Sequence, residues 1–327
     1  MKQTKMMVLG SALALLLAPG MAFSGNLADV IQMGDNNKAA ADQVGADNTA
    51  NISQYGNGLK ADVDQIGDTN KATVAQGAEG APVNSGSLVG YVSGAVIYQQ
   101  GDSNEASTTW HVGNLGSRIS QIGNDNDGTQ DLSGTSGYKA GKYAIDIQQV
   151  GNNNEAKQIT QAKYGTYGIQ EMLILQTGNL NIANQTSISG ISHGAEIIQT
   201  GNSNNSMQYQ DGMKDVVKAN MIGSSNVTSQ TQSYTTWGLT ERTATIDILG
   251  DTNNVTQSQF GVSSTADIDI AGNANIATQN QIGNNNIAKL TQTGNSNIAS
   301  QLQTGNGNSS TVSQVGSFNN TMVVQNN

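Results

Sequence analysis

The residues of this chain that could perform acid–base or nucleophilic chemistry are few and far apart. His111 and His193 are the only histidines, Cys is absent, and neither His accompanies a Ser or Cys motif. Catalysis by a side-chain base needs both a positioned base and a group that orients it. The absence of Cys also excludes thiol chemistry and disulfide bonds. The sequence therefore predicts that the protein is not an enzyme and that it binds no cofactor or small-molecule substrate.

Six Asp residues form two similar groups. Asp42 and Asp64 are separated by the same interval as Asp247 and Asp269, and each second member closely follows a further Asp, namely Asp62 and Asp267. Three interpretations stay open. The carboxylates are solvated surface charges, gatekeepers whose repulsion delays self-association, or ligands of a divalent cation. The calcium-binding pattern Gly-Gly-x-Gly-x-Asp is absent, and we predict no metal ligand among them.

The composition excludes most ordinary classes of protein. The 327 residues are 36% hydrophobic, 4% aromatic and 12% charged, and they include 39 Gly, 39 Asn and 31 Gln. This is too polar for a core of Leu, Phe and Val, and too poor in charge for an expanded disordered chain. Sequences rich in Gln and Asn favour β assembly. The net charge of −10 argues against nucleic acid as a partner, because phosphate contacts need Lys and Arg.

The first 24 residues have the pattern of a secretory signal peptide. Lys2 and Lys5 precede a short apolar run from Val8 to Ala18, and small residues follow it. Cleavage after Ala22 and cleavage after Ser24 fit equally well. A run of about 11 apolar residues is too short to cross a membrane. We therefore expect a signal peptide at 1–24 and a single exported domain at 25–327, with a net charge of about −12.

One short pattern recurs sixteen times between residues 32 and 319. Gln149-Val-Gly-Asn-Asn-Asn154 is a clear copy, and Asn follows the central Gly by three residues in every copy but one, where Leu59 replaces it. We expect the Gly to supply the unusual backbone angles of a tight arc and the Asn to bond the backbone groups that the arc leaves free. The predicted ladder asparagines are Asn48, Asn70, Asn104, Asn126, Asn154, Asn181, Asn204, Asn226, Asn253, Asn275, Asn286, Asn297, Asn308 and Asn319.

Each copy has room for one strand and one arc, and two copies make one rung of a stack. The glycines expected at one edge of the stack are Gly45, Gly67, Gly101, Gly123, Gly151, Gly178, Gly201, Gly223, Gly250, Gly272, Gly294 and Gly316. Alternation along the strand places the residues four and two positions before each Gly inside. The inner residues include an aliphatic series such as Ile119 and Ile147, and a glutamine ladder. The predicted ladder glutamines are Gln43, Gln65, Gln121, Gln149, Gln176, Gln199, Gln281, Gln292, Gln303 and Gln314.

The pattern predicts an all-β fold, a two-sheet β-solenoid of about 12 rungs with 22–28 residues each. At about 4.8 Å per rung it would be about 58 Å long. Extra residues are expected at the far arc, where a stack tolerates them. These insertions lie near 77–90, 133–142, 162–169, 188–194 and 233–242. Tyr91, Tyr138, Tyr143, Tyr164, Tyr167, Tyr234 and Trp237 lie in or beside them.

The C-terminal end of the expected stack has none of the features that protect a strand edge. From Ile270 to the end, the chain contains one charged residue, Lys289, and no Pro, and the arc glycines follow one another at equal intervals from Gly272. An uncapped and regular edge is a template for another copy of the chain. Self-association into a polymer is the predicted outcome.

The repeat resembles the curlin repeat, Ser-x5-Gln-x-Gly-x-(Gly/x)-Asn-x-Ala-x3-Gln. Residues 282–288, Ile-Gly-Asn-Asn-Asn-Ile-Ala, fit it, with Gln281 before and Gln292 after. The resemblance implies a subunit of curli, the extracellular amyloid fibres of Gram-negative biofilms. It also implies a related curli subunit as partner and export through an outer-membrane pore with accessory factors. This chain is longer than the familiar major subunit and has no Gly-rich segment after the leader. Major subunit and nucleator both stay open.

Other functions remain as alternatives. The second hypothesis is a monomeric β-solenoid adhesin or ice-binding protein that uses the arc loops or a flat face; the Thr rows expected for ice binding occur only at Thr177, Thr200, Thr293 and Thr304. A polysaccharide-cleaving β-helix would need clustered acidic and basic residues, and the basic residues are spread out. Leu173, Leu175 and Ile198 are expected to point outward, either as a lateral contact or through a local shift of register.

Overall fold

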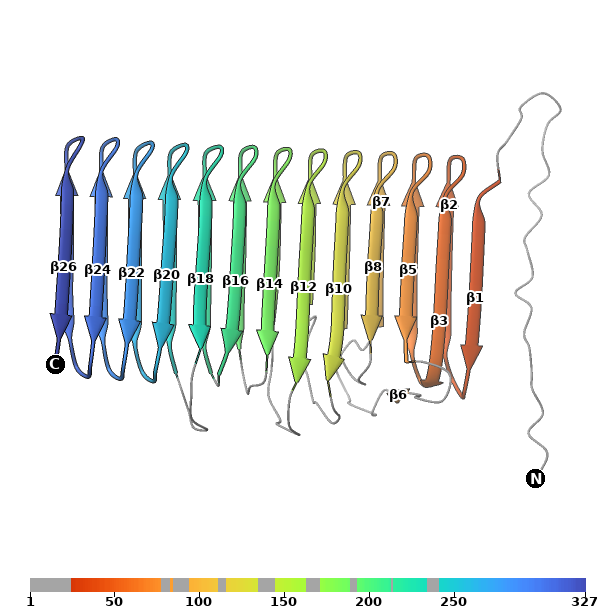
Figure 1. Cartoon of the computed structure of the whole chain (residues 1–327). Coiled ribbons are helices and arrows are strands. Elements are labelled where there is room, and N and C mark those ends of the chain that lie inside the picture. The colour runs from red at the N-terminus through yellow and green to blue at the C-terminus, as the bar shows by residue number, and fades with distance from the viewer. Residues whose placement is uncertain are drawn as a thin grey trace.

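The chain forms a stack of parallel β-strands arranged in two facing sheets (Figure 1). The computed structural model describes residues 25–77, 83–84, 94–110, 116–134, 145–162, 171–188, 193–212, 214–233 and 241–327. These residues contain strands and arcs but no helix, and so no helix there is long and apolar enough to span a membrane. The two-sheet β-solenoid expected from the repeat is confirmed.

The strands alternate along the chain between the two sheets. Sheet A contains β1 (Leu27–Met33), β3 (Thr49–Asn57), β5 (Lys71–Gln76), β8 (Glu105–Trp110), β10 (Asp127–Gly134), β12 (Glu155–Ala162), β14 (Ile182–Ile188), β16 (Asn205–Asp211), β18 (Val227–Ser233), β20 (Asn254–Phe260), β22 (Ile276–Ile282), β24 (Ile298–Thr304) and β26 (Asn320–Asn326). Sheet B contains β2 (Lys38–Val44), β4 (Lys60–Ile66), β7 (Gly94–Gln100), β9 (Gly116–Ile122), β11 (Ile145–Val150), β13 (Glu171–Thr177), β15 (Gly194–Thr200), β17 (Val216–Ile222), β19 (Thr243–Leu249), β21 (Thr265–Ala271), β23 (Ile287–Thr293) and β25 (Ser309–Val315). The short β6 (Val83–Asn84) pairs with the end of β3.

Each strand pairs in parallel with the equivalent strand of the next rung. Equivalent residues are mostly separated by 22 to 28 positions, as are Gln43 and Gln65 at the lower limit and Gln121 and Gln149 at the upper. The predicted upper limit is wrong at one rung, because Gln65 of β4 pairs with Gln99 of β7, a separation of 34. The additional residues lie between β5 and β7, and therefore they do not disturb the pairing of either sheet.

The arcs along the two long sides of the stack differ in regularity (Figure 1). The arc from each sheet B strand to the following sheet A strand, here called the tight arc, has the same short form in every rung. The arc from sheet A to sheet B, the variable arc, takes up all the differences in rung length. The predicted insertions belong to this arc, but most of their residues, including the six Tyr residues and Trp237, lie outside the described part of the chain.

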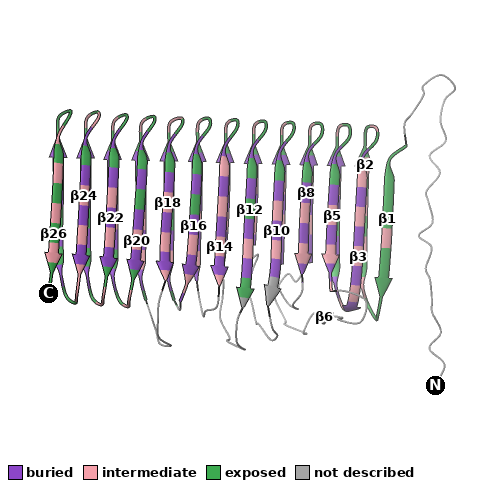
Figure 2. Cartoon of the chain, in the orientation of Figure 1, coloured by how far each residue is buried: buried purple, intermediate pink, exposed green. Residues whose placement is uncertain are grey.

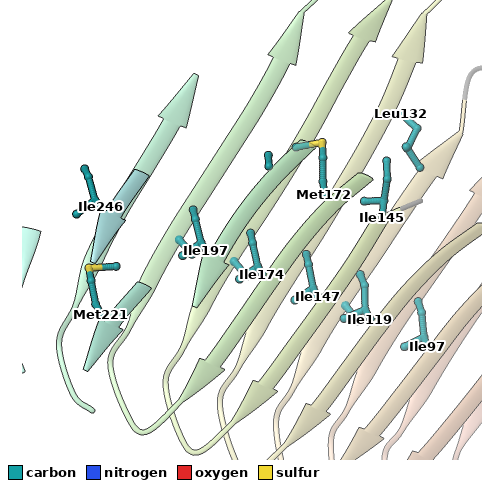
Figure 3. Packing of buried hydrophobic residues seen from close by; sticks show 14 of the residues in the cluster. Ile97, Ile119, Leu132, Ile145, Ile147, Met172, Ile174, Ile197, Met221 and Ile246 are labelled. Carbon is teal, nitrogen blue, oxygen red and sulfur yellow. The ribbon is translucent and has the colours of Figure 1, made fainter. Parts of the chain in front are cut away.

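Alternation along each strand builds the core between the sheets. Buried and less buried residues follow one another in inner strands such as β14 and β18 (Figure 2). An aliphatic column runs along sheet B in adjacent rungs, with Ile97, Ile119, Ile147, Ile174 and Ile197 all fully buried (Figure 3). The predicted inward positions are thus inside the stack. The core is thin, and many of its remaining side chains are amides.

Candidate functional site

The asparagines of the tight arc form a continuous hydrogen-bonded column. The backbone N–H and the side-chain Nδ2 of Asn154 donate to Oδ1 of Asn126, over 3.1 and 3.0 Å. The same Nδ2 also donates to the carbonyl oxygen of Gly178 in the next rung, over 2.8 Å. Twelve of the predicted asparagines belong to this column, whereas Asn286 and Asn308 lie in the variable arc. Each Asn side chain therefore satisfies a backbone donor and a backbone acceptor of the next rung, as Asn126 does for Asn154 and Gly151.

The glycines of the tight arc permit this close approach. All twelve predicted arc glycines have a positive φ, and Gly151 has a φ of 125°. A Cβ added at Gly151 would overlap the backbone carbonyl of Gly178 in the next rung. At Gly316 in the last rung the nearest atom to such a Cβ is Nδ2 of Asn319, 3.6 Å away. Stacking of a following rung is therefore what makes Gly necessary, in addition to its backbone angles.

A first glutamine ladder runs through sheet B. Six consecutive hydrogen bonds of 2.8–2.9 Å join Nε2 of each Gln to Oε1 of the next. Its members are Gln43, Gln65, Gln99, Gln121, Gln149, Gln176 and Gln199. Met221, Ile248 and Ile270 then occupy the same position, and a bond of 2.8 Å from Gln292 to Gln314 resumes the ladder. Gln99 was not among the predicted ladder residues, although it has the same spacing before Gly101.

Two further ladders lie in sheet A. One runs along the middle of the sheet through seven bonds of 2.8–3.0 Å, from Gln130 to Gln301. The other lies near the variable arc and joins Gln32, Gln54 and Gln76 at the N-terminal end and Gln232 through Gln325 at the C-terminal end. The predicted Gln281 and Gln303 belong to this ladder and not to that of Gln292 and Gln314. Because buried amides without partners are costly, these chains of bonds stabilise a polar core.

The six predicted Asp residues lie on the outer face of sheet B, in two clusters. Asp42 and Asp64 occupy paired positions of β2 and β4, and Asp247 and Asp269 occupy paired positions of β19 and β21. Burial, with the neighbouring charges of Asp62 and Asp42, raises the pKa of Asp64. Burial and the charges of Asp267 and Asp247 raise the pKa of Asp269 against the opposing effect of Lys289. In both clusters, therefore, one carboxyl group binds a proton more readily than an ordinary Asp does.

Lys289 distinguishes the second cluster from the first. Its Nζ lies 3.1 Å from Asp267 and 3.6 Å from Asp269. No residue of this kind compensates Asp62 and Asp64 among the ion pairs of the described residues. Within the described part of the chain, no group of three or more His, Cys, Asp or Glu side chains is arranged to hold a metal ion.

A third acidic column was missed by the sequence analysis. Glu105, Asp127 and Glu155 occupy paired positions of β8, β10 and β12 on the outer face of sheet A, and Lys71 bonds to Glu105 over 2.6 Å at one end. Burial, followed by the charges of Glu105 and Glu155, raises the pKa of Asp127. Each of these residues follows its arc Gly by four positions, so that counting forward from the glycines would have found the column.

A buried ion pair in the variable arc was also missed. The guanidinium of Arg242 and the carboxylate of Asp215 are both fully buried and form two bonds of 2.6 and 3.0 Å. The guanidinium donates further bonds to the backbone oxygens of Ser233, Asp211 and Gln259. Asp215 and Arg242 immediately precede β17 and β19, the place that Asn286 occupies before β23. An ion pair thus replaces the amide column where the variable arc is irregular.

The remaining predicted residues do not come together as a site. His193 is buried in the variable arc, and His111 lies outside the described residues. Leu173, Leu175 and Ile198 point outward on sheet B and are half-buried, with Leu175 paired with Ile198. Thr177, Thr200 and Thr293 are the last residues of strands in sheet B. Thr304 is the last residue of a strand in sheet A, so these four residues do not form one row.

The two ends of the stack present strand edges that no described residue covers. At the N-terminal end these are the outer edges of β1 and β2, and at the C-terminal end those of β25 and β26 (Figure 1). An unpaired edge carries a row of free backbone donors and acceptors. The inward residues of the two ends also agree in type, since Ala39, Ala41 and Gln43 of β2 correspond to Ser310, Val312 and Gln314 of β25.

A comparison with protein families matches segments near these two ends. The family described as the curlin associated repeat matches residues 24–56 and 283–316. These two segments are similar to curlin repeats. The first matched segment covers β1 to β3, and the second covers β23 to β25. The curlin repeat family is one of subunits of curli-type amyloid fibres, and its repeats are structural rather than enzymatic units. No curated protein matches the chain.

The geometry explains what a curlin repeat contributes. Its Gln supplies a rung-to-rung bond inside the stack, its Gly allows the arcs to approach, and its Asn satisfies the arc backbone. Between the two matched segments the described rungs keep the same arrangement, although Met221, Ile248 and Ile270 replace the Gln of the first ladder. The repeat therefore encodes a surface that stacks on a copy of itself.

Proposed function

We propose that the chain is a secreted structural subunit that self-assembles into curli-like amyloid fibres, which serve biofilm matrix formation, adhesion and surface colonisation. The observation that carries this proposal is the open strand edges at both ends of the stack; β1, β2 and β25 lie in segments that match the curlin repeat, and β26 follows the second segment. Parallel strands with Gln ladders at matching positions are the arrangement found in cross-β fibres. The partner is a second copy of the chain.

The amide ladders provide the means of joining two copies. Gln314 is the last residue of the first glutamine ladder, and Gln43 is the first. When β25 of one copy pairs with β2 of the next, Nε2 of Gln314 can donate to Oε1 of Gln43, as Gln292 does to Gln314. The junction then repeats the contacts within a subunit. The proposal includes export past an outer membrane with residues 1–24 removed, and a related curli subunit as a further partner.

Seeded polymerisation tests the proposal. Thioflavin-T fluorescence of the purified chain from residue 25 should rise after a lag that preformed seeds abolish, and the fibres should diffract with a repeat of about 4.8 Å. A soluble, folded β monomer with flat fluorescence in the presence of seeds would refute fibre formation and would favour a monomeric adhesin. N-terminal sequencing of the exported protein tests the leader separately, since it should start after Ala22 or Ser24.

A further inference from the structure

The number of strands in the two sheets bears on how two copies can join. Among the described residues, sheet A contains 13 strands in one continuous path and sheet B contains 12, and the first and last strands, β1 and β26, both belong to sheet A. If a second copy stacked with all its strands in place, β26 would pair with β1 of that copy. The edge of β25 would then face β2 of the second copy across one unfilled strand position. A junction without unpaired edges therefore requires one terminal strand to leave the stack.

The two terminal strands carry similar inward residues, identical at the Val and Gln positions. Ala28, Val30 and Gln32 of β1 correspond to Thr321, Val323 and Gln325 of β26. Each strand also follows an Asn in the tight-arc position, Asn26 before β1 and Asn319 before β26. Either strand could consequently occupy the edge of β3.

The contacts that hold β1 are ones that β26 of another copy can reproduce. Asn48 donates to Oδ1 of Asn26 from its backbone N–H over 3.0 Å and from Nδ2 over 3.3 Å. Asn319 donates to Asn297 in the same way, over 3.0 and 2.9 Å, so that its own Oδ1 is positioned for the donors of a following rung. Similarly, Nε2 of Gln32 donates to Gln54 over 2.6 Å.

Burial indicates which of the two strands leaves. Val30 is the only residue of β1 that is even half-buried, whereas Thr321, Val323 and Gln325 of β26 are all half-buried (Figure 2). Strand β1 also carries the charge of Asp29, and β26 has no charged residue. Displacing β1 therefore loses less packing than displacing β26.

We propose that β1 is a placeholder, which covers the edge of β3 in a single subunit and is displaced by β26 of a second copy when the fibre grows. This inference rests on the proposed fibre function. In the resulting junction β25 pairs with β2 of the second copy, which sets Gln314 beside Gln43 and Ser313 beside Asp42. Strand β26 pairs with β3 of that copy, which sets Val323 beside Ile52. Both sheets are then continuous through the junction.

A disulfide that holds β1 in place tests the proposal. Asp29 and Asn51 occupy paired, outward positions of β1 and β3, and the native chain has no Cys that could compete. Adjacent strands lie about 4.8 Å apart, within the range of roughly 4.4–6.8 Å between Cα atoms that a disulfide spans. Asp29→Cys with Asn51→Cys should, when oxidised, reduce incorporation into seeded fibres at least tenfold, and a reductant should restore it. Ser120→Cys with Gln148→Cys is the matched control, because it joins the neighbouring strands β9 and β11 far from both ends of the stack. This variant should elongate equally in both redox states.

The possible outcomes separate this inference from the proposed function. If the parent chain elongates and the oxidised β1 variant elongates equally fast, β1 stays paired and the inference is wrong. A chain that begins at Asp35 provides a second measurement, because without β1 it should elongate at least as fast as the parent. Slower elongation by this variant, with an unchanged β-sheet circular dichroism spectrum, would also overturn the inference. Failure of the parent chain itself to polymerise would refute the fibre function instead.

Discussion

Nε2 of Gln149 donates a 2.9 Å hydrogen bond to Oε1 of Gln176, its counterpart in the next rung, and a second 2.9 Å bond to the backbone oxygen of Asp127 in the opposite sheet. One side chain thereby joins neighbouring rungs and also the two sheets. The glutamine ladders thus take the place that large apolar side chains have in most protein cores, and the first prediction concerns this residue.

Gln149→Leu should destabilise the subunit by about 1–3 kcal/mol, because it leaves buried amide groups of Gln121 and Gln176 without their ladder partner. Urea unfolding of the unpolymerised chain measures the change. Gln148→Leu is the matched control, since Gln148 points outward from the same strand, and it should stay within about 0.5 kcal/mol of the parent. Equal effects of the two substitutions would show that the ladder does not stabilise the core.

Gly151→Ala should prevent correct stacking at its arc, because the added Cβ overlaps the carbonyl of Gly178 and the backbone has a positive φ. We expect a loss of more than about 3 kcal/mol from the clash and strain together. Gly194→Ala should be nearly neutral, since a Cβ at Gly194 has no neighbour closer than 3.9 Å. Thermal unfolding of both variants decides the matter, and a stable Gly151→Ala protein would contradict this account of the arc.

Asp64→Asn should stabilise the stack and shorten the polymerisation lag at pH 7. The pKa of Asp64 is raised above its ordinary value, so the folded state binds its proton more readily than the unfolded state does. Stability from this group therefore increases as the pH falls through the folded pKa, and the charged form at neutral pH is unfavourable. The difference between Asp64→Asn and the parent should consequently be largest at pH 7 and should disappear near the pKa of an unfolded Asp.

Lag times at several pH values between 4 and 7 measure this gatekeeping effect. Ser120→Asn introduces the same side chain at the same outward position of β9 and should leave the lag unchanged at each pH. If the lag of Asp64→Asn equals the parent value at pH 7, the Asp cluster is a group of solvated surface charges and not a gatekeeper.

Arg242→Met should destabilise the subunit by about 3–5 kcal/mol, because it leaves the carboxylate of Asp215 buried without its partner. Combining it with Asp215→Leu should recover much of the loss, since no buried charge then remains. Chemical denaturation of both single variants and the double variant gives the coupling energy. Additive effects of the two substitutions would contradict a direct interaction.

Deleting 270–327 should slow polymerisation. The shortened chain ends at Asp269 within β21, which becomes the last strand of sheet B. Asp269 has the same register position as Ser313 of the full chain, so it would lie beside Asp42 of the next copy. Like charges on paired strands repel. Seeded elongation rates of the shortened and full chains provide the test, and an unchanged lag and rate would show that the C-terminal rungs do not determine addition.

The repeat spacing was sufficient to predict the sheets, the inward positions and the tight arc. Each depends on local geometry, because a Gly and the Asn three residues later define one arc, and alternation along the strand determines which residues point inward. The Asp215–Arg242 pair could not be obtained in this way, since both residues lie in the variable arc, where spacing does not indicate which residues stack. The column of Glu105 and its neighbours was missed because the fourth position after each Gly was not compared. The long rung from Gln65 to Gln99 follows from the predicted positions of Gly67 and Gly101, and only the predicted range of rung lengths omitted it.

The direction of the glutamine bonds has a consequence for any assembly of this chain. In each of the glutamine ladders, the amide nitrogen donates to the Gln of the next rung toward the C-terminus, as Gln292 does to Gln314. One end of the molecule therefore offers nitrogen donors and the other offers oxygen acceptors, and two like ends cannot match. A filament built from such units has polarity. All its subunits point the same way, its two tips are chemically distinct, and they should grow at different speeds.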